Sequence, residues 1–418
     1  MDKHIAQITN KSVEQSGLPN DFKKALAEYI WNGFDAGATE VLLNFESNEI
    51  GYISSFSISD NGSGINIETI GDTFGHFLDS QKLLYSNKNS FVRGKKGKGR
   101  YAFSTFANAC KWTTTYQGPD SKYLQYSITI NKGELQSFET FDTIISKKKK
   151  TGTVVSFTDF FGLTGDLLLT KEFTDYLASE FGWFLYLNRA KDFKILINGT
   201  KLSYDEIIGH AESFNLPIGN YTFQIDFIRW NQRIGDKYYF YFLTDDQKEA
   251  FKKHTSFNNK AIDYHHSVYV KSSFFSDFHE TADESPVLEF SGKNQTDPTF
   301  RALIKELTNI VSEQEKEFIR GTQADKLLNE YEATGILPYF NESELEQQHR
   351  QDLKDVIREL YCAEPRLFHG LNIQQRKAFA GILNILLATN QKGEVLNVLE
   401  NITELSEEER GRVGMVLE

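Results

Sequence analysis

Two polar side chains lie one helical turn apart in the segment FKKALAEYIWNGFDA, residues 22–36. Glu28 and Asn32 are four residues apart and Asp35 follows near the same face, so a helix gathers the three side chains. A carboxylate beside a carboxamide suits a general base next to a magnesium ligand, because magnesium takes few protein oxygens together with phosphate and water. The alternative is a solvated helix face, since such pairs are common on surface helices.

A second candidate is the turn DNGSG that follows an apolar stretch. Asp60 can accept a hydrogen bond from the exocyclic amine of a flat ligand, while Gly62 and Gly64 let that ligand approach the backbone. An ordinary hairpin turn accounts for the same residues.

A third segment alternates glycines with cations just before a stretch that we expect to be a helix of small residues. Backbone N–H groups, the helix dipole and side-chain charge then converge on one anion, and phosphate is the natural ligand. The competing interpretation is a mobile basic loop that contacts nucleic-acid backbone. The residues concerned are Gly94, Lys95, Lys96, Gly97, Lys98, Gly99 and Arg100.

The hydrophobic periodicity indicates which elements must position these residues. It predicts a helix over 22–36, strands over 39–45 and 52–59, and an antiparallel sheet within 111–159. An aromatic-rich helix over 171–188, further strands and a helix at about 298–320 predict a second α+β unit, and the pattern beyond Pro338 is helical. We therefore expect domains over 1–165, 166–330 and 331–418, with a continuation beyond Glu418 left open.

Composition limits the protein class. The 418 residues are 39% hydrophobic and 25% charged, with two cysteines, no apolar run long enough to cross a bilayer and no signal peptide, so we expect a cytoplasmic globular protein. The formal charge of −12 repels nucleic acid over the whole molecule, so any such contact must be local. The short run Lys147–Lys150 is best interpreted as a solvated turn rather than a DNA-binding patch.

The three segments occur in one order between residues 22 and 100, and at this point the sequence resembles a family. EYIWNGFDAGA resembles the E-x-x-x-N-x-x-D-A-G-A box, SDNGSGI the D-x-G-x-G box, and RGKKGKGRYAF the glycine-rich lid of the GHKL or Bergerat-fold ATPases. TGTVVSF resembles the G-T-x-V strand of that family and contributes Thr153. The implied fold class is α+β: a Bergerat-type α/β sandwich ATPase domain, then an α+β transducer-like domain and a helical C-terminal region.

The resemblance also implies roles and cofactors, ATP and Mg²⁺. Glu28 would activate the attacking water, Asn32 would hold magnesium and Asp60 would bind adenine, while the lid closes over the phosphates. Asp35 would brace the site. In this family a transducer lysine reaches the γ-phosphate, and Lys293 matches it in position before a helix, although its neighbours depart from the gyrase and MutL patterns; the alternative is a solvated loop lysine.

The subtype is narrowed by what the sequence lacks. Only a short segment precedes the Glu28 helix, which disfavours a sensor histidine kinase, and the lid lacks the MutL-like F-R-G-E-A sequence. The lid looks more like that of stand-alone HtpG-like or MORC-like ATPases, which often act as ATP-gated homodimers that drive an effector, some in antiviral defence against phage. A first interpretation is therefore an ATP-hydrolysing clamp that dimerises through its first ~20 residues and acts on a protein effector or nucleic acid. Alternatives are a nucleotide-binding scaffold or sensor with negligible hydrolysis, and a MutL-like DNA-associated ATPase; Glu28 favours hydrolysis, because a pure binder needs no base.

Overall fold

The structure is a computed structural model that describes residues 9–74, 98–234, 237–256, 263–279, 293–389, 411–412 and 414–415. The chain divides into two compact units, one formed by residues 1–253 with 265–294 and the other by residues 254–264 with 295–418. The first unit combines sheets with helices, so the mixed α+β class expected from the sequence is confirmed.

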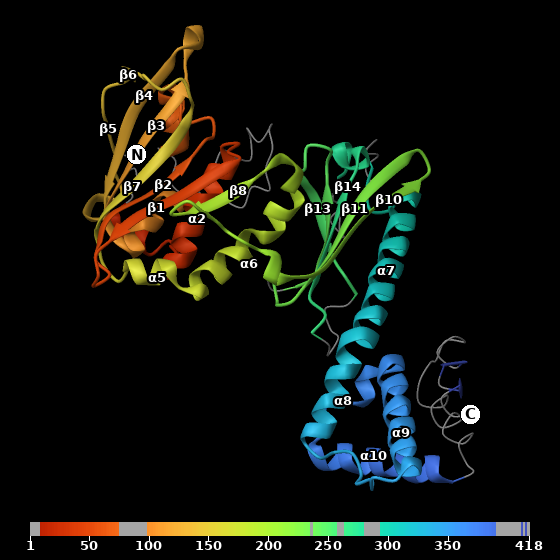
Figure 1. Ribbon diagram of the computed structural model, residues 1–418. Coiled ribbons are helices and arrows are strands. Elements are labelled where there is room, and N and C mark those ends of the chain that lie inside the picture. Colours follow the sequence, from red (N-terminus) through yellow and green to blue (C-terminus); the bar gives the residue numbers. More distant parts are fainter. Residues whose placement is uncertain are drawn as a thin grey trace, which may run out of the picture. The chain divides into compact units, whose positions relative to one another are not determined.

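A nine-stranded sheet forms the N-terminal part of the first unit (Figure 1), with the order β5-β4-β3-β7-β2-β1-β8-β9 and β6 also paired to β4. Among the pairings described within this sheet, only that of β1 with β8 is parallel. A parallel partner needs a long crossover, and this one contains helix α6 (Lys171–Leu187). β8 and β9 thus extend the first sheet although they lie beyond residue 165. The strands are β1 (Glu40–Ser47), β2 (Ile53–Asp60), β3 (Ala107–Gln117), β4 (Tyr123–Asn131), β5 (Glu139–Thr140), β6 (Ile144–Ile145), β7 (Gly152–Phe160), β8 (Lys194–Ile197) and β9 (Thr200–Lys201).

Helix α2 (Phe22–Asp35) begins where the Asp21 carboxylate accepts a hydrogen bond from the Lys23 N–H at 2.8 Å. Its apolar side packs on α6, with ring centroids 4.7 Å apart for Trp31 and Phe181. These contacts fix the helix that carries Glu28 and Asn32. Shorter helices of the same region are α1 (Asn10–Glu14), α3 (Ile70–Phe74) and α5 (Gly165–Leu169).

The segment after the basic lid differs from the expected helix of small residues. It is a short 3₁₀ helix, η2 (Gly99–Thr105), and strand β3 begins already at Ala107. Pairing of Ala107 with Phe160 of β7 draws this stretch into the sheet. Tertiary pairing therefore outweighs the helix-forming tendency of the alanines.

A five-stranded sheet of order β10-β11-β14-β12-β13 completes the first unit. Trp183 of α6 stacks on Tyr269 of β14, with ring centroids 5.7 Å apart and an interplanar angle of 7°. Helix α6 therefore contacts both α2 and the five-stranded sheet. The strands are β10 (Ile208–Ile218), β11 (Tyr221–Trp230), β12 (Tyr239–Leu243), β13 (Glu249–His254) and β14 (His266–Lys271).

The second unit is helical where it is described. Helix α7 continues through a π-helical turn, η8, into α8, and the Arg320 guanidinium of that turn forms a bidentate ion pair with Glu359, at 2.8 and 2.9 Å. The elements are α7 (Pro298–Phe318), η8 (Ile319–Gln323), α8 (Ala324–Ala333), α9 (Glu344–Ala363) and α10 (Ile373–Ala388). Within the described ranges, no helix is long and apolar enough to cross a membrane.

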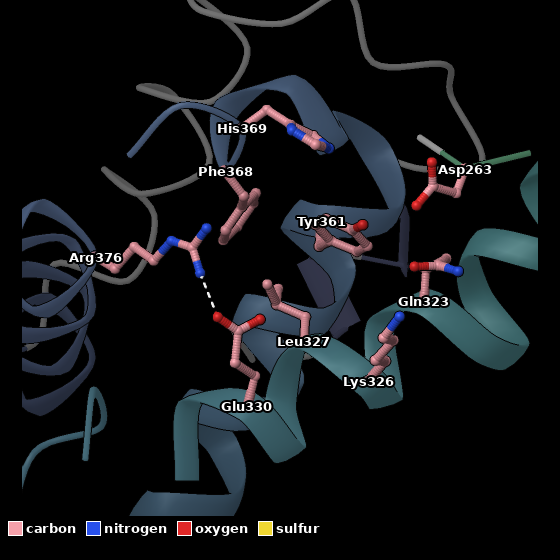
Figure 2. Close-up of a pocket in the computed structure, with 9 residues that line it drawn as sticks. All are labelled: Asp263, Gln323, Lys326, Leu327, Glu330, Tyr361, Phe368, His369 and Arg376. Atoms are coloured by element: carbon pink, nitrogen blue, oxygen red, sulfur yellow. Dashed lines mark hydrogen bonds and ion pairs between the residues drawn. The ribbon is translucent and has the colours of Figure 1, made fainter. Parts of the chain in front are cut away.

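A pocket of about 180 Å³ lies in this helical unit. Figure 2 shows Arg376 pointing toward Glu330, and the ion pair between them measures 2.8 Å. The Arg376 guanidinium also donates to the Leu371 carbonyl at 3.0 Å. These two charges are therefore engaged in fastening α10 to α8.

Candidate active site

One face of α2 presents the predicted base and metal ligand. Glu28 and Asn32 are half-buried, whereas their neighbours Leu26 and Ile30 are fully buried in the core. The helix therefore holds both polar groups at the margin of the core, where their side chains have few alternative positions.

The backbone of Gly99 lies against this pair. A methyl group on Gly99 would lie 2.8 Å from the Glu28 Oε2 atom and 3.5 Å from the Asn32 Nδ2 atom. The structure thus brings together the Glu28 face and the residue where the lid segment enters η2. Four other predicted lid residues, Gly94, Lys95, Lys96 and Gly97, lie outside the described residues.

Asp60 stands at the end of β2 with one carboxylate oxygen engaged. Its Oδ1 atom accepts hydrogen bonds from the Gly62 N–H at 2.8 Å and from the Thr153 N–H at 3.3 Å. Burial raises the pKa of Asp60 to about 6, against the lowering effect of these two backbone bonds. A ligand that donates a hydrogen bond to this carboxylate would therefore favour its ionised form.

The glycines around Asp60 allow close packing. A side chain at Gly64, which has a φ of +73°, would clash with the Thr115 carbonyl oxygen, and one at Gly62 would lie 2.8 Å from the Ala36 carbonyl oxygen. Both turn residues predicted from the sequence are thus needed where the chain passes between α2 and the sheet.

Two threonines tie the turn to the sheet. Thr153 is buried, and its hydroxyl oxygen lies 3.1 Å from that of Thr114 on β3. The Thr114 hydroxyl also accepts a hydrogen bond from the Ile65 N–H at 2.9 Å. Thr114 was not singled out from the sequence, because threonines that alternate along a strand have no distinguishing pattern.

Asn61 is a second residue that the sequence reasoning missed. Its side-chain oxygen accepts hydrogen bonds from the Thr39 and Glu40 N–H groups, at 2.9 and 3.0 Å. It thereby fixes the start of β1 beside the Asp60 turn. The DNG sequence could have indicated this role, since asparagine side chains often bond nearby backbone in turns.

The remaining basic lid residues contact protein groups. The Lys98 ammonium donates to the Ser16 carbonyl oxygen. Arg100 is buried, and its guanidinium lies 4.7 Å from the Tyr101 ring centroid and 5.6 Å from that of Phe74. Their predicted contacts with phosphate stay predictions.

Lys293 is held within the first unit. Its ammonium lies 3.0 Å from the Asp277 carboxylate and 4.7 Å from the ring centroid of Tyr221. Partial burial lowers the pKa of Lys293, but hydrogen bonding to Tyr221 and Asp277 outweighs it, so the pKa is raised. The lysine is thus charged and engaged by a carboxylate that the sequence reasoning did not identify.

Part of the segment expected to form a polar N-terminal arm is packed on its own chain. Val13 is fully buried, and the Asn10 side-chain oxygen accepts a hydrogen bond from the Leu135 N–H at 2.7 Å. The Thr105 hydroxyl donates to the Pro19 carbonyl at 2.7 Å. Residues 9–19 therefore have a core contact that their polar composition concealed, and residues 1–8 lie outside the described residues.

Comparison with known proteins supports the superfamily. Residues 20–157, about a third of the chain, match the family described as histidine kinase-, DNA gyrase B-, and HSP90-like ATPases. This range contains Glu28, Asn32, Asp60, Gly99 and Thr153, so the prediction of a GHKL-type ATPase domain is confirmed at that level. No curated protein sequence shows detectable similarity to the chain.

The solved structures that the chain matches include the ATPase region of Saccharomyces cerevisiae topoisomerase II. Two such structures, one bound to ICRF-187 (dexrazoxane), are each 14% identical to this chain, with a TM-score of 0.35. Each alignment covers 60% of this chain and 73% of the other.

Proposed function

We propose that the chain binds ATP with Mg²⁺ and hydrolyses it. The observation that carries the proposal is the close approach of Gly99, where the lid segment enters η2, to the predicted base Glu28 and the predicted metal ligand Asn32. Phosphoryl transfer depends mainly on positioning and charge neutralisation, and these residues supply both.

Asp60 is proposed to select adenine. Both of its backbone hydrogen bonds end on Oδ1, so neither uses Oδ2. An exocyclic amine can donate to that second oxygen, and the bond favours the ionised carboxylate. Because burial disfavours the charge in the first place, nucleotide binding and ionisation of Asp60 should promote each other.

The donor set fits magnesium. No group of three or more His, Cys, Asp or Glu side chains in the described part of the chain could hold a metal ion. Magnesium is commonly bound by one or two protein oxygens with phosphate and water, so the Asn32 amide oxygen is a sufficient protein ligand. When bound, the ion would neutralise phosphate charge beside Glu28.

Glu28 is proposed to take the proton of the attacking water. It stands one helical turn from Asn32 and faces the Gly99 backbone, so water positioned there is within reach of its carboxylate. The half-buried position limits the rotamers of the side chain, which favours one productive orientation.

ATP binding is proposed to drive closure and homodimerisation of a cytoplasmic, HtpG-like or MORC-like ATPase that acts on an effector. Lys293 would leave Asp277 to touch the γ-phosphate on closure. A role in antiviral defence would be one use of such a clamp. Nucleotide binding without turnover would instead identify a scaffold or sensor.

The test is ATP hydrolysis with Mg²⁺ or with EDTA, together with binding of a non-hydrolysable ATP analogue. We expect slow Mg²⁺-dependent turnover that Glu28→Gln abolishes without loss of analogue binding, whereas Asp60→Asn should lose binding. Turnover that survives Glu28→Gln unchanged would contradict the assignment of the base.

A further inference from the structure

Tyr29, the residue after Glu28, has its hydroxyl group inside the protein. The side chain is 3% exposed, and its ring packs edge-on against Phe157 of β7, with centroids 5.1 Å apart. A phenylalanine would fill this place equally well, so the packing does not explain the hydroxyl group.

The hydroxyl makes two hydrogen bonds to η2, beside an interaction with the Cys110 thiol of β3. It donates to the Arg100 carbonyl at 3.0 Å and accepts from the Phe103 N–H at 3.0 Å. One oxygen therefore links α2 to both ends of a single turn of the 3₁₀ helix. Such helices satisfy their backbone groups poorly, so an outside partner matters for their position.

Each of the two elements that this link joins, α2 and η2, also carries residues of the candidate site. On α2, Tyr29 follows Glu28; on η2, Arg100 follows Gly99, whose backbone faces Glu28 and Asn32. A shift of η2 relative to α2 must therefore change the approach of Gly99 to the proposed base and metal ligand.

The surroundings keep the hydroxyl in the form that both bonds require. Burial, with the Cys110 thiol beside it, raises the pKa of Tyr29 well above the usual range. The phenol thus stays protonated at physiological pH and can donate and accept at once.

We propose that Tyr29 is a positioning residue for the ATPase reaction: its hydroxyl holds the Gly99 end of the lid in register with Glu28 and Asn32. This inference rests on the proposed function. Tyr29 touches neither substrate nor metal in this role and acts through the η2 backbone, so it should affect turnover more than binding of the nucleoside end of the ligand.

The test compares Tyr29→Phe with Tyr126→Phe in the full chain. Tyr126 is the matched control, because it is 2% exposed in β4 of the sheet on which Tyr29 packs. Its hydroxyl has no hydrogen-bond partner among the described residues. We expect Tyr29→Phe to lower kcat about tenfold and leave ADP affinity within about twofold, and Tyr126→Phe to change neither. An unchanged kcat for Tyr29→Phe, or an equal loss of ADP affinity and kcat, would overturn the positioning role.

Hydrogen exchange separates this inference from the proposed function. Tyr29→Phe should speed amide exchange in residues 99–105 of the nucleotide-free chain, relative to the wild type and to Tyr126→Phe, whether or not ATP is hydrolysed. If the wild-type chain shows no turnover, hydrolysis as the proposed function fails. The role of the Tyr29 hydroxyl in holding η2 is then tested by this difference in amide exchange alone. Equal exchange in the wild type, Tyr29→Phe and Tyr126→Phe would reject it.

Discussion

Gly33 of α2 packs directly on Asp60 of β2. A methyl group on Gly33 would lie 3.0 Å from the Asp60 Cβ atom and equally close to a methyl group of Val41. The helix that carries Glu28 and Asn32 is thus set against the proposed adenine-binding carboxylate with no side chain between them. The absence of a side chain at position 33 therefore sets how closely α2, with Glu28 and Asn32, approaches Asp60.

Gly33→Ala should therefore weaken nucleotide binding more than it changes stability. Alanine favours the helix by about 1 kcal/mol, which offsets part of the strain of the tight contact, while Asp60 must move to accommodate the methyl group. We expect ADP affinity to fall about tenfold by calorimetry. Gly381→Ala in α10 is the control, because nothing lies within 4 Å of its added methyl group, and it should leave ADP affinity unchanged. Unaltered ADP affinity in Gly33→Ala would show that this contact does not set the position of Asp60.

Asp60 should make the stability of the protein depend on pH. Its pKa rises from 3.8 to about 6 on folding, so the folded state binds the proton more tightly than the unfolded state does. The contribution of Asp60 to the free energy of unfolding must then decrease as pH rises from about 4 to 6, by about 3 kcal/mol for a shift of this size. The decrease is nearly complete by about pH 7, one unit above the folded-state pKa.

Denaturant unfolding of the wild type and of Asp60→Asn at pH 4.5 and 7 measures this effect. Asparagine does not titrate, so only the wild type should lose stability through this group as pH increases. The free energy of unfolding of the wild type should therefore fall relative to that of Asp60→Asn. ADP affinity of the wild type should increase over the same range, because the amine of adenine is best accepted by the ionised carboxylate. A stability difference that is constant with pH would mean that Asp60 keeps an ordinary pKa.

The positions of the main elements could be predicted from the sequence because hydrophobic periodicity dominates them. The helix over 22–36, the strands around Phe56 and the alternating stretches of 111–159 lie where that pattern predicts. The segment 99–110 differs, since its alanines and aromatics suit a helix, while pairing with β7 makes a strand of its last residues, from Ala107 on. Pairing across distant segments is not visible in local periodicity.

In the candidate site, too, some residues could be predicted from the local sequence and others depend on contacts between distant segments. Glu28, Asn32 and Asp60 could be selected because their spacing has a chemical meaning on a helix or at a strand end. Gly33 and Tyr29 could not, because their roles depend on which atoms face them across the fold. The glycine inside a helical pattern was the one local signal available, as glycine there commonly marks close packing.

Lys293 should contribute to turnover and not to ADP binding. In the structure its ammonium pairs with Asp277 at 3.0 Å, so reaching a γ-phosphate requires that this ion pair breaks. Lys293→Ala should lower kcat while ADP affinity stays constant, since ADP lacks the phosphate that the lysine would touch. Asp277→Asn removes the competing carboxylate and should raise kcat or leave it unchanged. Steady-state kinetics and ADP calorimetry on both variants decide the role, and equal losses of ATP and ADP binding in Lys293→Ala would argue against it.

The N-terminal segment should mediate ATP-dependent dimerisation through residues before Thr9. Residues 9–19 are anchored on their own chain by the buried Val13 and by the bond from the Leu135 N–H to Asn10, so deleting them would damage the core as well as any dimer contact. Removing residues 1–8 alone is the cleaner change. If ATP favours the dimer, the dimer must bind ATP more tightly by the same factor.

Light scattering on the Glu28→Ala protein, which should retain ATP, measures that linkage. We expect the mass to double with ATP in the full chain and to remain monomeric once residues 1–8 are removed, with unchanged unfolding of both proteins in denaturant. Asn10→Ala serves as the control for the anchored part: it should lower stability by about 1 kcal/mol through the lost bond to Leu135 and still dimerise. A chain that stays monomeric with ATP, or one that dimerises equally well without residues 1–8, would refute a dimer built through this segment.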